Sequence, residues 1–209
     1  MLAEIAGRVV VIDDDRSVRE ALESLLESVG LHVDLYGSVA EFLAAASVDA
    51  PTCLVLDVRL PGQGGLEFQR TLAAAGVGTP IIFITGHGDI PMSVQAMKGG
   101  AIEFMTKPFR DQDLLDAIQS GLDRDRARQE RERGLAQLRA LFESLTARER
   151  QIMGLVTKGL LNKQIASEVG VSEITVKVHR ASLMRKMEAT SLADLVLKAE
   201  KLRETAGSI

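Results

Sequence analysis

Two short apolar runs of the sequence end in carboxylates. Residues 9–12 precede Asp13 and Asp14, and residues 54–56 precede Asp57. Short β-branched and apolar runs bounded by turn residues are typical of buried strands. Open parallel α/β sheets place their ligand sites at the carboxyl ends of the strands, so we expect the three carboxylates to lie together. Carboxylates about 5 Å apart repel by roughly 3 kcal/mol per pair. A bound cation would remove this cost, and oxygen ligands open to water suit Mg²⁺.

Acids that follow a strand can also be simple N-caps of the next helix. We favour this interpretation for Asp15, which directly follows the first pair of acids. For Asp13, Asp14 and Asp57 we favour a metal site, because three acids from two strands converge there.

Thr85 and Lys107 follow the apolar runs of two further predicted strands. We expect them at the same sheet edge as the acids. A phosphoryl group needs a hydroxyl donor for one oxygen and a positive charge for another. The set therefore predicts that Asp57 is a nucleophile that forms an acyl-phosphate.

The segments that must position these residues alternate between strand and helix patterns over about 120 residues, which predicts one α/β doubly wound domain with a five-stranded parallel sheet. The predicted strands are 8–12, 32–36, 53–57, 80–85 and 101–105, and the predicted helices are 17–29, 38–46, 66–75, 91–98 and 111–122.

Charge divides the chain further. Residues 1–122 contain 8 Lys and Arg against 17 Asp and Glu, whereas residues 146–209 contain 11 against 7. This asymmetry suggests two modules with different partners. Residues 123–139 alternate in charge, and we interpret them as a solvated helical linker. Leu135, Leu138, Phe142 and Leu145 follow a heptad-like spacing that leaves a dimer seam open as an alternative.

Composition narrows the class of protein. Apolar residues make up 46% of the 209 residues, which is ordinary for a folded globular chain. No apolar run approaches the roughly 18 residues that a membrane helix needs, and the first residues lack the apolar core of a signal peptide. The single Cys53 cannot form an internal disulfide. These features predict a cytoplasmic protein with no membrane partner.

The last part of the chain has helical patterns only, predicted at 146–157, 162–169, 172–187 and from 191 onward. Thr146 and Glu149 form a Thr-x-x-Glu capping box at the first of these helices. The third has Ile174, Val176, Leu183 and Met187 available for packing. We therefore predict three segments: a first domain at 1–122, a charged helical linker at 123–143, and an all-α four-helix domain at 144–209.

Residues 1–122 resemble the receiver domain of response regulators, because Asp13-Asp14, Asp57, Thr85 and Lys107-Pro108 have that family's order and spacing. The resemblance implies a flavodoxin-like fold with Asp57 as the phosphoacceptor. It implies that Asp14, Asp57 and the backbone carbonyl of Arg59 bind Mg²⁺ (or Mn²⁺) directly, with Asp13 acting through water.

The same resemblance assigns a switch. Lys107 would contact the phosphoryl group and precede a cis bond to Pro108, Thr85 would move toward the phosphate, and Phe104 would follow as the aromatic switch residue. Without the family, plain core packing is the better interpretation of Phe104.

Residues 145–203 resemble the LuxR-type helix-turn-helix domain. The matching runs are 145–150, 159–166 and 171–180. A recognition helix lies in the major groove of double-stranded DNA with its first residues against base edges. Lys177, Val178 and Ala181 match the family's base-reading positions, and Ala181 would make an apolar contact to a thymine methyl. We expect phosphate contacts from Thr175, Asn162, Lys163, Arg180 and Lys186.

The whole chain resembles response regulators of the NarL/FixJ type, with a linker similar to the FixJ branch. This implies a DNA-binding transcriptional regulator that a sensor histidine kinase phosphorylates, that forms a homodimer on phosphorylation and that acts on RNA polymerase. It would be an enzyme only toward its own phosphorylation and dephosphorylation.

Two alternatives are a Mg²⁺-dependent phosphohydrolase, for which no cap insertion is seen, and a helix-turn-helix that binds protein. Salt-dependent DNA binding would separate the latter from a DNA-binding regulator.

Overall fold

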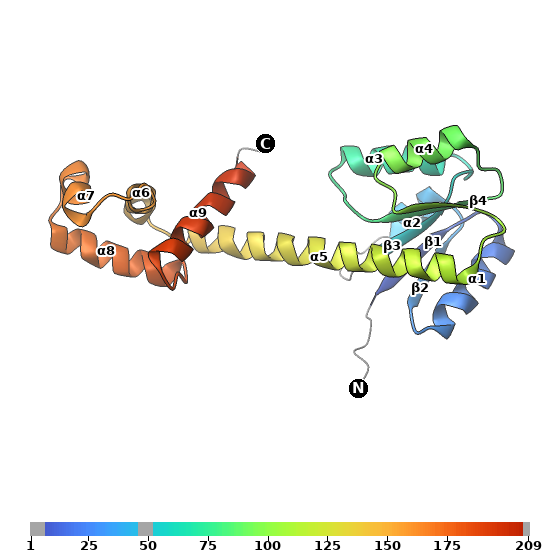
Figure 1. Cartoon of the computed structure of the whole chain (residues 1–209), viewed down its shortest axis with the longest axis horizontal. Coiled ribbons are helices and arrows are strands. Elements are labelled where there is room, and N and C mark those ends of the chain that lie inside the picture. The colour runs from blue at the N-terminus through green and yellow to red at the C-terminus, as the bar shows by residue number, and fades with distance from the viewer. Residues whose placement is uncertain (1–6, 46–51, 207–209) are drawn as a thin grey trace. The chain divides into compact units, whose positions relative to one another are not determined.

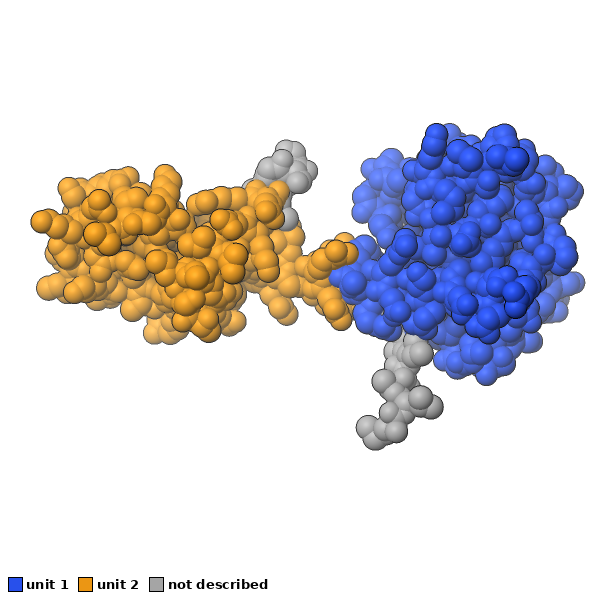
Figure 2. All heavy atoms as spheres, viewed as in Figure 1, with its two compact units in different colours: residues 1–129 blue, residues 130–209 orange. Residues whose placement is uncertain are grey.

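The computed structural model describes residues 7–45 and 52–206 of the chain (Figure 1). The chain divides into two compact units, Met1–Gln129 and Glu130–Ile209 (Figure 2). The predicted domain boundaries differ from this division, and the limits of the linker stay a prediction.

The first unit contains a five-stranded parallel sheet with the strand order β2-β1-β3-β4-β5. This order confirms the predicted doubly wound α/β fold. The final strand begins at Glu103, two residues later than expected. The strands are β1 (Arg8–Ile12), β2 (His32–Tyr36), β3 (Thr52–Asp57), β4 (Ile81–Thr85) and β5 (Glu103–Thr106).

Five helices follow the strands in turn. α1 and α5 cover one face of the sheet, and α2, α3 and α4 cover the other (Figure 1). The helices are α1 (Arg16–Ser28), α2 (Val39–Ala45), α3 (Gly65–Ala74), α4 (Ile90–Lys98) and α5 (Asp111–Glu143).

The strands are apolar throughout because both faces of the sheet are buried. Successive side chains of a strand point to opposite faces. Val9 and Val11 therefore pack under α1 and α5, whereas Val10 and Ile12 pack under the other three helices. Cys53 is fully buried in the first of these cores, and burial raises the pKa of its thiol to about 12. This agrees with its interpretation as a small buried apolar group.

The charged run is helical, as expected, and forms part of α5. The expectation that it is solvated is wrong at Asp125, which is 1% exposed. Its Oδ2 accepts a hydrogen bond of 2.9 Å from the backbone N–H of Thr52, and its Oδ1 accepts one of 2.7 Å from the guanidinium of Arg128. Asp125 thus attaches α5 to the start of β3, three residues beyond the predicted end of the first domain at residue 122.

The second unit contains the end of α5 followed by α6 (Ala147–Val156), α7 (Asn162–Val169), α8 (Glu173–Lys186) and α9 (Leu192–Ala206). Leu138 and Leu145 are buried in its core, so the chain itself covers these two members of the possible dimer seam. The capping box of Thr146 and Glu149 is confirmed.

The core side of α8 consists of Val176 and Leu183 together with the C-cap residue Met187, all fully buried. The expectation that Ile174 also packs there is wrong, since its side chain is 75% exposed. Ile174 lies on roughly the opposite side of the helix from Val176, because the two residues are two positions apart and each position rotates by about 100°. α8 packs against both α6 and α7, which completes a helix-turn-helix.

Candidate phosphoryl site and nucleic-acid interface

The carboxylates at the strand ends are brought together by strand register. β1 and β3 are neighbours, with Ile12 opposite Leu56, so Asp13 and Asp57 follow at the same level of the sheet. One ligand atom each of Asp13, Asp14 and Asp57 lies within 4.8 Å of the others. Asp13 and Asp57 are buried and Asp14 is exposed, so the cluster has a solvent-facing side.

Each of the two buried carboxylates uses its oxygens in the same way. Oδ1 of Asp13 accepts the backbone N–H of Asp15 at 2.9 Å, and Oδ1 of Asp57 accepts that of Arg59 at 3.0 Å. Both Oδ2 atoms accept from Lys107 Nζ, at 2.6 Å for Asp13 and 3.2 Å for Asp57. The backbone and one ammonium therefore fix the orientation of both groups. The carboxylate of Asp15 accepts from the N–H of Ser17 and caps α1, as expected.

The pKa values of Lys107 and Asp13 depend on both burial and neighbouring charge. Burial lowers the pKa of Lys107, but the hydrogen bond to Asp13 and the charges of Asp13 and Asp57 outweigh it, so the pKa is raised. Burial raises the pKa of Asp13, although its hydrogen bond with Lys107 opposes this. A carboxylate is costly to bury, and the ammonium offsets part of that cost.

Three carboxyl groups gather around one ammonium at this edge of the sheet. The donors are hard oxygens, two of them fixed and one open to water, which is the kind of set that Mg²⁺ takes with substrate phosphates. The acidic cluster is thus compatible with a divalent metal ion.

Thr85 ends β4 next to this cluster, and its backbone carbonyl accepts from the N–H of Lys107 at 2.8 Å. Its hydroxyl accepts from the N–H of His87 at 3.3 Å, and its side chain is buried. Phe104 on β5 is half-buried, with its ring centroid 6.3 Å from that of Phe83. The peptide bond between Lys107 and Pro108 is cis.

The residues expected to contact DNA lie on α7 and α8. Lys163, Lys177, Val178 and Ala181 are exposed, and Thr175 is half-buried. Asn162 Oδ1 accepts from the Arg180 guanidinium at 2.5 Å, which joins the start of α7 to the middle of α8 through two predicted phosphate-binding residues.

Lys186 lies in a different environment. Its Nζ donates to Glu149 Oε2 at 2.7 Å within the second unit. Its predicted phosphate contact would therefore compete with an internal ion pair.

Comparison with protein families matches both units. Residues 9–119 match the response regulator receiver domain, and residues 143–199 match the luxR family of bacterial regulatory proteins. Relatives cover nearly the whole chain. It is 55% identical over 93% of its length to nodulation protein W of Bradyrhizobium diazoefficiens, covering 86% of that protein. It is 44% identical over 91% of its length to the transcriptional regulatory protein FixJ of Azorhizobium caulinodans, covering 90% of it.

The chain belongs to the NarL/FixJ family of response regulators.

Solved structures agree with this assignment. Response regulator StyR matches with a TM-score of 0.87 and 50% identity over 94% of this regulator and 99% of StyR. Full-length FixJ from B. japonicum matches with a TM-score of 0.56 and 40% identity, over 95% of this regulator and 98% of FixJ. The regulator is therefore a two-component transcriptional regulator, with a receiver that implies a histidine kinase partner and a LuxR-type domain that implies DNA binding. Within the described residues of the regulator, the helices are too short or too polar to cross a membrane.

The burial and the distant partners of two acids of the regulator were not predicted from the sequence. One is Asp125, described above. The other is Glu149, whose carboxylate also accepts from Ser182 at 2.7 Å and from Lys186, so that it joins α6 to α8. The capping box indicated its local role, but its partners on α8 are more than 30 residues away and leave no local pattern.

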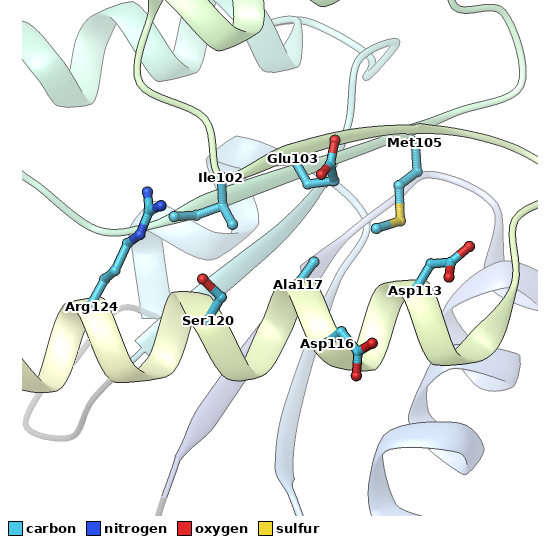
Figure 3. A pocket seen from close by; sticks show the side chains of 8 residues that line it. All are labelled: Ile102, Glu103, Met105, Asp113, Asp116, Ala117, Ser120 and Arg124. Carbon is cyan, nitrogen blue, oxygen red and sulfur yellow. The ribbon is translucent and has the colours of Figure 1, made fainter.

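The receiver also has a hollow between β5 and α5 that the sequence did not indicate (Figure 3). Three carboxylates, Glu103, Asp113 and Asp116, line it together with Arg124. The strand-end residues of the candidate phosphoryl site do not contribute to its lining.

Proposed function

We propose that the regulator accepts a phosphoryl group on Asp57 from a sensor histidine kinase. The observation that supports this most directly is the shared ammonium of Lys107, which holds the carboxylates of Asp13 and Asp57 side by side. A carboxylate oxygen of Asp57 attacks the phosphorus of the phosphohistidine, the P–N bond breaks, and the imidazole nitrogen keeps the electron pair. Lys107 then donates to the transferred group, and the Thr85 hydroxyl donates to another of its oxygens.

Asp14, Asp57 and the backbone carbonyl of Arg59 would hold Mg²⁺ or Mn²⁺, with Asp13 acting through water. When bound, the metal supplies charge neutralisation for the carboxylates and the phosphoryl oxygens. Apart from accepting and later losing this group by hydrolysis, the regulator has no activity on external substrates in this proposal.

Phosphorylation adds about two negative charges next to Thr85. In our proposal Thr85 turns toward the new group and Phe104 fills the space that it leaves. The surface that responds is α4, on which Ile90, Val94 and Met97 form an exposed apolar stripe one helical turn apart. A stripe of this kind, 79% exposed at Ile90, supports a homodimer formed through α4.

The dimer would bind double-stranded DNA through α8 of each copy. Lys177, Val178 and Ala181 would read bases, and Thr175, Asn162, Lys163, Arg180 and Lys186 would contact phosphates. Bound regulator would then act on RNA polymerase in the cytoplasm, where the kinase's phosphoryl group and the DNA are both available.

Phosphoryl transfer is tested by intact-mass spectrometry after incubation with phosphoramidate and Mg²⁺. We expect the parent to gain one phosphoryl group and Asp57→Asn to gain none. Asp15→Asn is the matched control, because asparagine also caps a helix and Asp15 is outside the proposed metal set. Undiminished phosphorylation of Asp57→Asn would refute the assignment of the phosphoacceptor.

DNA reading is tested by titrating Lys177→Ala and Lys163→Ala against specific and scrambled duplexes at several salt concentrations. Lys177→Ala should lose roughly 1–3 kcal/mol on the specific duplex only. Lys163→Ala should weaken binding to both duplexes and flatten the salt dependence. If Lys177→Ala weakened both duplexes equally, its base-reading role would be wrong.

A further inference from the structure

α8 carries two apolar faces, and one of them is exposed. Val176, Leu183 and Met187 form the buried face. On the opposite side, Ile174 and Val178 are 75% and 63% exposed. Ala181 is exposed as well, and these three residues follow the i, i+4, i+7 spacing of one helix face. We call Ile174, Val178 and Ala181 the apolar strip.

Two exposed cations border the apolar strip. Lys177 and Arg185 are exposed and lie on the same side of α8, within an arc of about 100° that also contains the strip. Glu173 is the one acid among the residues of α8. Exposed apolar residues bordered by positive charge fit an anionic ligand that presents apolar groups. The major groove of DNA has this character, because the C5 methyl groups of thymines lie between two phosphate backbones.

Ile174 lies near the start of α8, where a recognition helix contacts bases. Ser172 caps α8 by accepting the N–H of Thr175 at 3.1 Å, so Ile174 is the second residue of the helix. The first residues of a recognition helix contact base edges. Ile174 is also more exposed than Val178, although it is large and apolar.

We propose that Ile174 is a specificity-determining residue that contacts a thymine methyl in the major groove, next to a second thymine contacted by Val178. The inference rests on the proposed role of α8 as the DNA-reading helix. The Cα atoms of Ile174 and Val178 are separated by four residues, or about 6 Å along the axis. Successive base pairs are about 3.4 Å apart. The two thymines therefore lie roughly two base pairs apart where the helix follows the groove.

The experiment begins with duplexes that the full-length, beryllofluoride-treated regulator selects from a random pool. Each thymine of a selected duplex is then replaced singly by deoxyuridine, which lacks only the C5 methyl. For the parent, we expect one or two replacements per half-site to weaken binding roughly fourfold, the factor for removing one buried methyl-sized group. Ile174→Ala should bind the all-thymine duplex about that much more weakly and should be insensitive to deoxyuridine at one of these positions.

Val178→Ala should become insensitive at a different position. Leu197→Ala is the control, because Leu197 is 58% exposed on α9 and outside the strip. Its binding should respond to deoxyuridine at the same positions as binding of the parent does. Thermal melting should show that every variant folds.

The outcomes separate the inference from the proposed function. If Lys177→Ala loses sequence preference but Ile174→Ala keeps the parent's deoxyuridine profile, Ile174 does not read thymine, although α8 still reads DNA. If no thymine of a selected duplex is sensitive to deoxyuridine, the inference is also wrong. If the parent selects no sequence at all, the reading role of α8 and the inference both fail, and a protein partner for the strip is favoured.

Discussion

A Cβ atom at Gly65 would lie 2.3 Å from the backbone carbonyl oxygen of Asp57, so only glycine lets α3 begin beside the candidate phosphoryl site without displacing this backbone. The N–H of Gly65 also donates to the carbonyl of Val58 at 3.0 Å. We predict that Gly65→Ala displaces the backbone that carries Asp57. Its phosphorylation by phosphoramidate should slow at least tenfold, and its melting temperature should fall by several degrees, since overpacking costs roughly 1–3 kcal/mol.

The neighbouring glycine provides the control for this prediction. A Cβ atom at Gly64 would meet the Val58 carbonyl oxygen at 3.5 Å, an ordinary van der Waals distance. Phosphoramidate should therefore phosphorylate Gly64→Ala at close to the rate for the parent. Equal rates for Gly65→Ala and Gly64→Ala would show that the close approach to Asp57 has no effect on the reaction.

Gly88 lies against both proposed switch residues. A Cβ atom there would lie 2.9 Å from Phe104 Cε1 and 3.1 Å from Thr85 Cγ2. We predict that Gly88→Ala obstructs the movement of these two side chains while leaving the carboxylates in place. The variant should still take up a phosphoryl group, but phosphorylation should increase its dimer fraction in analytical ultracentrifugation far less than in the parent.

Gly86→Ala is the matched substitution, because a Cβ atom at Gly86 has no described heavy atom within 4 Å. It should dimerise as the parent does. If Gly88→Ala dimerised normally on phosphorylation, coupling through Thr85 and Phe104 would be contradicted.

The strand-end cluster was predictable because it follows from two simple rules. Buried parallel strands are short apolar runs, and their carboxyl ends meet at one edge of the sheet. Asp13, Asp14 and Asp57 are therefore found together from their positions alone. The DNA-contact roles and the switch came from family resemblance, and they stay predictions.

Other features depend on contacts between distant residues. Asp125 resembles its exposed neighbours in the charged run, and nothing local shows that Thr52 donates to it. Ile174 was assigned to the core because helical periodicity identifies apolar positions but does not say which of two apolar faces is covered. The close approaches at Gly65 and Gly88 are a further case, because a glycine in the sequence does not distinguish a turn from a close approach of backbone or side chains.

Asp125 should contribute to the stability of the receiver. Asp125→Asn keeps the shape of the side chain but places an N–H donor against the donors of Thr52, Arg128 and Gln129. A buried polar group without its partner costs roughly 1–3 kcal/mol. We expect urea denaturation, followed by a probe in the receiver, to show a loss of stability in this range.

Asp123→Asn is the control for this change, because Asp123 forms an exposed ion pair with Arg126. Exposed pairs contribute about 0–1 kcal/mol, so its unfolding curve should lie close to the parent's. Similar losses in both variants would mean that the burial of Asp125 does not decide its contribution.

Glu149 should make the stability of the DNA-binding unit depend on pH. Burial raises the pKa of Glu149, but hydrogen bonds from Lys186, Ser182 and Thr146 outweigh it and lower the pKa from 4.5 to about 2. A carboxyl group whose pKa is lower in the folded state stabilises the fold above its unfolded pKa. That stabilisation, at most roughly 3 kcal/mol, is fully present above about pH 4.5 and is lost as the pH falls toward 2.

Glu149→Gln removes the charge and retains the size of the side chain. We expect hydrogen exchange of α6 and α8 to show a less stable unit than the parent at neutral pH, with a difference that shrinks as the pH falls from 4.5 toward 2. Glu168→Gln, at an exposed position of α7, should follow the parent at every pH. If the parent and Glu149→Gln lost stability in parallel over this range, the ion pair with Lys186 would not be the source of the pH dependence.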